Sequence, residues 1–285
     1  MGGGGEFSIA APDEVVAEQL SGPALAEVRR IEEKYSRYRA DSVIGRISAL
    51  AGSGEWFSCD EETLAFLKLA DKLYRDSDGL FDITSGVLRR AWDFKTPRLP
   101  SSELLAELCS RTGWSRVERE DKRIRLPEPG MELDFGGFGK EYAADRAAAE
   151  LVRLGVKHGF VNLAGDIRII GPQLDGTPWV IGIQDPRVPG KLAASIPLSG
   201  GALATSGDYE RYFVLEGRRY CHVLNPRTGY PVTHWRSISV IAPTAVAAGC
   251  CSTIAMLKGD LAIEFLKNSG VLFLGIDQDG HIHRQ

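Results

Sequence analysis

The sequence predicts an α+β fold. Apolar residues recur at helical spacing in the first part of the chain, and short segments of alternating polarity dominate the second part. The two types do not alternate strictly, which argues against a doubly wound sheet. The 285-residue chain is 44% hydrophobic and 25% charged, an ordinary balance for a globular protein with a sizeable core. We expect one domain over residues 1–285, with a helical N-terminal lobe (about 10–115) and a strand-rich lobe (about 115–285).

The first lobe is expected to hold one short strand and four helices. Apolar positions at helical intervals define the long first helix, and Asp60 is the expected N-cap of the second. A polar turn at 76–82 feeds the third helix, which ends at Trp92. In order, we expect a strand at 7–10 and helices at 13–35, 60–74, 83–92 and 101–111.

The second lobe is expected to contain mostly strands. A hairpin at 115–127 and a strand at 132–135 precede a long helix that begins in the Gly-rich stretch FGGFGK and ends at Gly155. Two helices, from about 245 and at 261–267, are expected near the C-terminus, before a turn at Asp279-Gly280. Further strands are expected at 160–163, 166–170, 179–184, 193–197, 209–215, 219–224, 237–242 and 271–276.

Charge and hydropathy narrow the possible partners. A formal net charge of −4 and a pI of about 5.8 argue against a general nucleic-acid binder. The apolar runs are too short for a membrane span, and no signal-peptide pattern opens the sequence. We therefore expect a cytoplasmic chain, or a periplasmic or membrane-anchored one whose leader has been removed.

The five cysteines do not form a recognisable site pattern. Their number is odd and no C-x-x-C occurs, so a disulfide framework and a structural zinc site are both unexpected. Cys250 and Cys251 are adjacent and point to different sides of any regular element. We expect both to be small packing residues.

Several polar stretches are candidates for a site. The stretch LDFGGFGK (133–140) places a Gly-rich turn and Lys140 before a helix, an arrangement that can bind phosphate but that differs from a Walker A loop. It can equally be a plain structural turn. Gly165-Asp166 is either a hairpin turn or an exposed acid at a ligand cleft. His222 precedes a turn rich in Gly and Pro, and Arg227 in that turn is either a phosphate ligand or a solvated residue.

Taken together, seven stretches resemble one family. They are SRYRADS, DGLFDITSGVL, LDFGGFGKEYAADRAA, NLAGDIR, ATSGDYERYF, HVLNPRTGYPV and APTAVAAGCCST. Their order and distances are similar to those of the FAD:protein FMN transferases, the ApbE family, over nearly the whole chain. The resemblance implies an ApbE-like α+β fold with mixed antiparallel sheets, packed helices and an FAD cleft between lobes.

The resemblance also implies an activity. Members bind FAD and magnesium, move FMN onto a Thr or Ser hydroxyl of a target protein, and release AMP; some hydrolyse FAD instead. Such chemistry needs charge stabilisation at the phosphates and a base for the hydroxyl proton. On this chain, His222 is the implied group that assists proton removal.

The implied binding residues follow from the same motifs. Tyr38 is expected against the flavin ring, with Met1 on the same side. Leu80, Phe81 and Asp82 are expected to line the flavin or adenine. Asp134 and Lys140 are expected to flank the FAD, and Leu203 to touch it through its backbone. The implied magnesium ligands are the carbonyl of Gly137 and the hydroxyl of Thr253.

One departure from the family pattern affects the metal site. The family motif A-D-x-x-x-T places a metal-binding Asp where this chain has Gly249, and a second departure is Lys140-Glu141 where Lys-Gly is common. Magnesium is usually held by one or two carboxylates. Either substrate phosphates and another acid, such as Asp166 or Asp208, recruit the metal, or the chain binds FAD with weak or lost transferase activity. An engineered replacement of Asp by Gly at position 249 would also produce this sequence. If the site merely lacks a ligand, Gly249→Asp should raise metal affinity.

Overall fold

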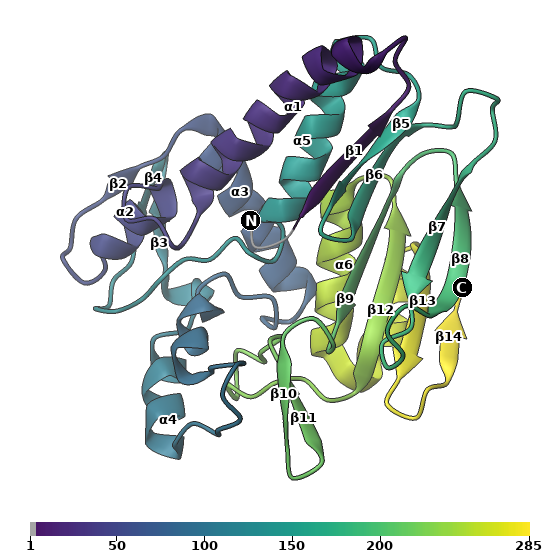
Figure 1. Cartoon of the computed structure of the whole chain (residues 1–285). Helices are drawn as coiled ribbons and strands as arrows, with labels where there is room; N and C mark the ends of the chain where they lie inside the picture. Colours follow the sequence, from purple (N-terminus) through teal and green to yellow (C-terminus); the bar gives the residue numbers. More distant parts are fainter. Residues whose placement is uncertain (1–3) are drawn as a thin grey trace.

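The computed structural model describes residues 4–285 as a mixed helix and sheet structure (Figure 1), which confirms the α+β prediction. Within these residues one sheet has seven strands in the order β1-β5-β6-β9-β12-β13-β14, and each neighbouring pair is antiparallel. The strands are β1 (Gly5–Ile9), β5 (Gly159–Leu163), β6 (Asp166–Gly171), β9 (Ala202–Gly207), β12 (Trp235–Ala242), β13 (Leu272–Asp277) and β14 (Ile282–Arg284). The most N-terminal strand therefore pairs with β5, far along the sequence.

Helices and a ribbon cover the two faces of this sheet. Helices α5 (Gly139–Arg153) and α6 (Ala245–Lys258) contact the strands on one face, and α1 (Glu14–Tyr35) packs on α5. The ribbon of β7 (Trp179–Gln184) and β8 (Leu192–Leu198) packs its isoleucines on the other face. Strand β9 shows the alternation that makes this possible, because Ala204 joins the helix side while Leu203 joins the ribbon side.

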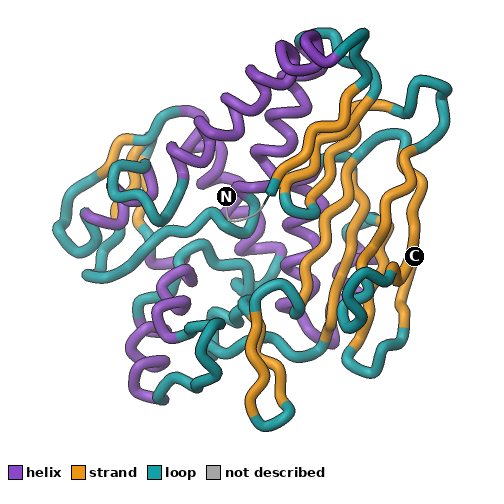
Figure 2. The backbone as a smooth tube through the Cα atoms, in the orientation of Figure 1, coloured by secondary structure: helices purple, strands orange, loops and turns teal. Residues whose placement is uncertain are grey.

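The N-terminal helices and a small sheet form the part on the left of Figure 2, beside the large sheet. Asp13, Ser42, Asp60 and Ser101 each cap a helix by accepting a hydrogen bond from a backbone N–H three residues on. The elements are α2 (Val43–Ala49), β2 (Phe57–Ser58), α3 (Glu61–Asp76), η1 (Ser85–Ala91), α4 (Ser102–Ser110), η2 (Trp114–Arg116), β3 (Glu118–Glu120) and β4 (Arg123–Arg125).

The C-terminal part adds a hairpin of β10 (Tyr212–Leu215) with β11 (Arg218–Cys221), and the short helices η3 (Gly259–Leu261) and α7 (Ala262–Asn268). One helical stretch among the described residues, Ala245–Asn268, has the length and apolar composition of a membrane span. Its α6 segment packs on β9 and β12, and most of the apolar side chains of α6 are buried in the protein core. We interpret it as a core helix.

Several sequence-based expectations differ from the structure in detail. The hydroxyl-rich segment ALATSG lies outside the strands expected from the sequence, but it forms β9 in the middle of the large sheet. The strand expected at 132–135 is irregular, because no neighbouring strand pairs with it. The expected third helix is the 3₁₀ helix η1, α2 was not predicted, and α5 begins at Gly139 rather than Phe135.

Candidate functional site

A cleft of about 1200 Å³ lies between the N-terminal helical part and the large sheet. Its walls come from the loop after α1, the loop before η1, the Gly-rich turn before α5, the β5–β6 turn, β9, the segment after β11 and α6. Met1 lies outside the described residues. The other predicted site residues all line this one cleft: Tyr38, Leu80, Phe81, Asp82, Asp134, Gly137, Lys140, Leu203, His222 and Thr253.

The Gly-rich turn is held in place by Asp134. Its carboxylate accepts hydrogen bonds from the Gly136 N–H (2.8 Å) and from Arg37 Nη1 (2.9 Å). Burial raises the pKa of Asp134, but the charges of Arg89 and Arg37, with these hydrogen bonds, outweigh it and keep the pKa below its usual value. The Phe81 ring packs on the turn so closely that a Cβ at Gly137 would lie 2.6 Å from it.

Lys140 lies in the first turn of α5 and pairs with an acid of the neighbouring hairpin. Its Nζ lies 2.7 Å from Asp166 Oδ2. Asp166 follows the tight β5–β6 turn, in which Ala164 and Gly165 have positive φ values of 50° and 93°. Gly165-Asp166 is thus a hairpin turn as predicted, and Asp166 also lines the cleft. The expectation of an exposed acid was wrong, because Asp166 is only 2% exposed.

His222 enters the cleft just after β11. Burial, followed by the positive charges of Arg211, Arg89 and Lys140, lowers the pKa of His222 to about 4. Its Nδ1 is buried and has no hydrogen-bond partner among the described residues. The three cations line the same cleft. The imidazole is therefore neutral at neutral pH and lies in a positively charged environment.

The flavin or adenine residues expected from the sequence differ in exposure. Tyr38 is 79% exposed at the cleft, with the Arg37 guanidinium 5.4 Å from its ring centre. Phe81 and Leu203 are buried in the walls. Asp82 is also buried, and its two oxygens accept hydrogen bonds from the Thr84 and Trp114 backbones. The Asp82 side chain thereby fixes the loop before η1.

Helix α6 presents the hydroxyl of Thr253 to the cleft, and the buried hydroxyl of Ser252 lies behind it. Ser206 Oγ, from β9, lies 3.0 Å from Thr253 Oγ1 and 2.8 Å from Ser252 Oγ, and Ser252 donates to the Gly249 carbonyl (3.0 Å). The carboxyl group of a residue on another helix, α5, lies against this turn of α6. A Cβ at Gly249 would lie 2.6 Å from Cγ and 2.8 Å from Oε1 of Glu141.

Glu141 is the site residue that motif reasoning missed. It is 6% exposed and lines the cleft, and no N–H or hydroxyl group within residues 4–285 donates to its Oε2. Burial, followed by the negative charge of Asp166 and a hydrogen bond between the two carboxyl groups, raises the pKa of Glu141 well above its ordinary value. The departure from Lys-Gly at 140–141 was the available signal, but only the fold shows what Glu141 faces.

Hydrogen bonds one helical turn from Glu141 and Gly249 fix the position of α5 relative to α6. Asp145 accepts hydrogen bonds from the backbone N–H groups of Ala245 (2.9 Å) and Val246 (3.0 Å), at the N-terminus of α6. Residues 141 and 145 share one face of α5, and residues 245 and 249 share one face of α6. The two contacts, Asp145 with Ala245 and Glu141 with Gly249, therefore show the helices running in opposite directions here.

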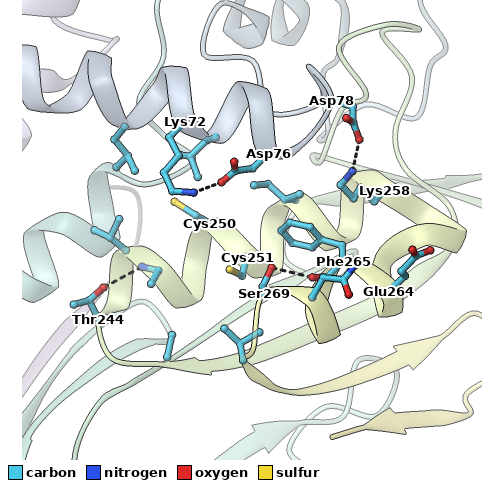
Figure 3. Close-up of a pocket in the computed structure, with 18 of the residues that line it drawn as sticks. Lys72, Asp76, Asp78, Thr244, Cys250, Cys251, Lys258, Glu264, Phe265 and Ser269 are labelled. Atoms are coloured by element: carbon cyan, nitrogen blue, oxygen red, sulfur yellow. Dashed lines mark hydrogen bonds and ion pairs between the residues drawn. The ribbon is translucent and has the colours of Figure 1, made fainter.

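Other candidates lie elsewhere. Asp208 forms two hydrogen bonds of 2.7 Å with Arg187 and does not line the cleft. Arg227 donates to the Asp78 carbonyl, also away from it. A second hollow of about 960 Å³ lies on the other side of α6 (Figure 3). There Cys250 and Cys251 are free thiols among apolar groups, as packing residues would be, and burial raises the pKa of both.

The comparisons with known proteins are consistent with one another. The model of the ApbE family matches residues 4–273. The FAD:protein FMN transferase of Haemophilus influenzae is 30% identical over 285 residues, which cover 95% of this chain and 81% of that protein. The one from Escherichia coli K12 is 28% identical over 87% of this chain and 74% of its own length.

Comparison with solved structures indicates the same family. The ApbE protein of Thermotoga maritima matches with a TM-score of 0.90 and 34% identity, over 100% of this chain and 94% of that one. The flavinyl transferase ApbE of Pseudomonas stutzeri matches with a TM-score of 0.84 and 27% identity, over 99% and 94%. Sequence, fold and the gathering of the motif residues in one cleft all lead to the same result: this chain belongs to the ApbE family.

Proposed function

We propose that this chain transfers the FMN half of FAD to a Thr or Ser hydroxyl of an acceptor protein, with magnesium present, and releases AMP. The observation that carries the proposal is the single cleft in which ten residues predicted from separate motifs meet. The names of the curated relatives, FAD:protein FMN transferase, support it. The cleft exceeds the roughly 300–1000 Å³ of most small-molecule sites, which suits a dinucleotide.

The charges of the cleft suit a diphosphate. Lys140, Arg89 and Arg211 line it, and each lowers the pKa of His222, so their fields overlap at that side chain. A group of cations in a partly enclosed site attracts an anionic substrate and stabilises charge that develops on the phosphates. The N-terminus of α5, where Lys140 lies, adds partial positive charge.

The reaction is a substitution at phosphorus without change of oxidation state. The acceptor hydroxyl oxygen attacks the phosphorus of the FMN half and forms a new P–O bond. The bond from that phosphorus to the bridging oxygen breaks, and AMP leaves with the bridging oxygen. The hydroxyl proton is transferred to a base, which releases it to solvent.

His222 is our candidate for that base. It is neutral near pH 7, so it can accept a proton, but a pKa of about 4 makes it a weak base in the empty cleft. A bound diphosphate would bring negative charge beside His222 and raise its pKa toward the working pH. The substrate would thereby increase the basicity of the group that deprotonates the acceptor.

The apolar residues would bind the two ring systems of FAD. Tyr38 offers an exposed aromatic face at the cleft, where a planar flavin can stack. Leu80 and Phe81 form the adjoining wall, and Leu203 contributes a buried strand position. Asp134 would remain an anion that orders the Gly-rich turn.

The cleft fits a magnesium ion by the chemistry of its donors. Two oxygen groups that a hard cation prefers line it: the buried carboxyl of Glu141 and the hydroxyl of Thr253. The carbonyl of Gly137 is a further donor in the same cleft. When bound, magnesium would neutralise charge on the transferring phosphate and the leaving AMP.

The absence of a carboxylate at Gly249 favours a second candidate, a chain that binds FAD with weak or no turnover. One experiment separates the two. Purified chain is mixed with FAD, with and without magnesium, in the presence of Thr- or Ser-containing acceptor peptides. Bound flavin and released AMP are both measured, and flavin that stays on peptide after denaturation is counted.

The expected result is AMP release that requires magnesium, with an equal amount of FMN attached to peptide. AMP accompanied only by free FMN would identify a hydrolase instead. Tight flavin binding without AMP would favour the second candidate. A chain that does not bind FAD would overturn both.

A further inference from the structure

We infer that Glu141, on α5, supplies the carboxylate that binds the divalent cation in this cleft, and that Gly249 on α6 leaves the space for it. The inference deepens the proposed function and rests on it. Relative to the family motif, the acidic metal ligand thus lies on α5 instead of on α6.

The first argument is spatial. The Cβ that any other residue would have at position 249 would lie 2.6 Å from Cγ, 2.8 Å from Oε1 and 3.0 Å from Cδ of Glu141. The Glu141 carboxyl therefore occupies the space that a side chain at position 249 would begin to fill. A residue with a side chain at 249 therefore requires either a shift of the Glu141 side chain or a smaller residue at 141.

The second argument is the state of the carboxyl group. Glu141 is 6% exposed and lines the cleft, and within residues 4–285 its Oε2 receives no hydrogen bond from an N–H or hydroxyl group; its polar neighbour is the carboxyl group of Asp166. A buried carboxylate oxygen without a partner is costly and is usually hydrogen-bonded, paired or bound to a metal. Lys140, the adjacent cation, has its Nζ 2.7 Å from Asp166 instead.

The third argument is the set of neighbours. Glu141 and Asp166 bring two acids to one region, and Lys140 balances one of them. On the α6 side, the hydroxyls of Thr253, Ser252 and Ser206 form a connected group next to Gly249. Two adjacent carboxyl groups that share a proton, with hydroxyl oxygens on the neighbouring helix, are groups that a hard divalent cation can bind in place of that proton.

The fourth argument is rigidity. Asp145, one turn after Glu141, binds the backbone of Ala245 and Val246, one turn before Gly249. These hydrogen bonds fix the backbone of α5 against that of α6 beside Glu141 and Gly249. The carboxylate is thus held at a defined position, as a metal ligand must be.

The test measures metal binding directly. Free Mn²⁺, a spectroscopically visible substitute for Mg²⁺, is followed by electron paramagnetic resonance as the full chain is titrated without nucleotide. Glu141→Gln keeps the shape of the side chain and removes its charge. Glu150→Gln is the matched control, because Glu150 lies on the same helix, pairs with Arg153 and does not line the cleft.

We expect Glu141→Gln to weaken Mn²⁺ binding at least about tenfold and Glu150→Gln to leave it unchanged, since loss of even an indirect partner of a metal costs about 10–100-fold. Equal affinity in the two variants would overturn the inference. The double variant Glu141→Gly with Gly249→Asp returns the carboxylate to α6. If Glu141→Gln fails to fold, the double variant tests the inference instead. A Mn²⁺ affinity near that of the parent chain would support the inference that the carboxylate on α5 replaces one on α6. A folded double variant that does not bind Mn²⁺ would refute it.

AMP release from FAD, measured on the same proteins, separates this inference from the proposed function. If the parent chain binds Mn²⁺ through Glu141 but releases no AMP with Mg²⁺, the metal site stands and the transferase proposal fails. If the parent and Glu141→Gln release AMP and bind Mn²⁺ equally, the transferase proposal stands and the role of Glu141 fails.

Discussion

Replacement of His222 should change how the stability of this protein depends on pH. Burial, followed by the charges of Arg211 and Arg89, lowers the pKa of His222 to about 4 in the folded chain, against about 6.5 in an unfolded chain. Above pH 6.5 the imidazole is neutral in both states and the fold keeps its full stability. As the pH falls from 6.5 toward 4, the unfolded chain binds a proton that the folded chain does not, so stability is lost.

The size of the effect follows from the two pKa values. A difference of about 2.5 corresponds to about 3 kcal/mol once the pH is below both values, and most of it is lost by pH 4.5. His222→Gln removes the titrating group. Urea unfolding at pH 7 and pH 4.5, without nucleotide or metal, should therefore show about 2–3 kcal/mol less acid destabilisation in the variant than in the parent chain.

The control is His234→Gln, since His234 is half-exposed and does not line the cleft. Each variant is compared with the parent chain. Carboxylates that titrate in the same pH range contribute equally to both, so their contribution to the free energy of unfolding cancels. If the parent chain and His222→Gln lose the same free energy between pH 7 and pH 4.5, the buried, neutral state of His222 is refuted, and with it our candidate for the base.

Three further predictions concern the helices and the cleft. Asp145→Ala removes the cap on Ala245 and should lower the free energy of unfolding by about 1–2 kcal/mol in urea; a loss below about 0.3 kcal/mol would show that α6 does not depend on this cap. Tyr38→Ala should change stability by less than about 0.5 kcal/mol, since the side chain is exposed, but weaken FAD binding about tenfold in a flavin-fluorescence titration; unchanged affinity would place the flavin elsewhere. The structure also changes the expectation for Gly249→Asp: alone it should destabilise the chain by about 1–3 kcal/mol through its clash with Glu141, and Glu141→Gly should restore most of that loss. Additive losses in thermal unfolding of the double variant would contradict this.

The sequence by itself determined much of this protein. Helix caps at Asp60 and Ser101, the hairpin turns and the α+β class follow from local chemistry, because a cap or a turn depends on residues a few positions apart. The ordered motifs were also enough to identify the ApbE resemblance and to name ten residues that share one cleft. Such motifs are local in sequence, so they can be recognised before their spatial arrangement is known.

The tertiary structure decided what depends on distant partners. Segment 202–207 is a central strand because β12 pairs with it and α6 covers its small residues, although its composition is typical of a turn. Within residues 4–285, no strand pairs with the segment at 132–135, so it is irregular. Gly249 looked like a missing ligand until the fold placed Glu141 against it. Two helices far apart in the sequence share that space, and only their packing shows which of them carries the carboxylate.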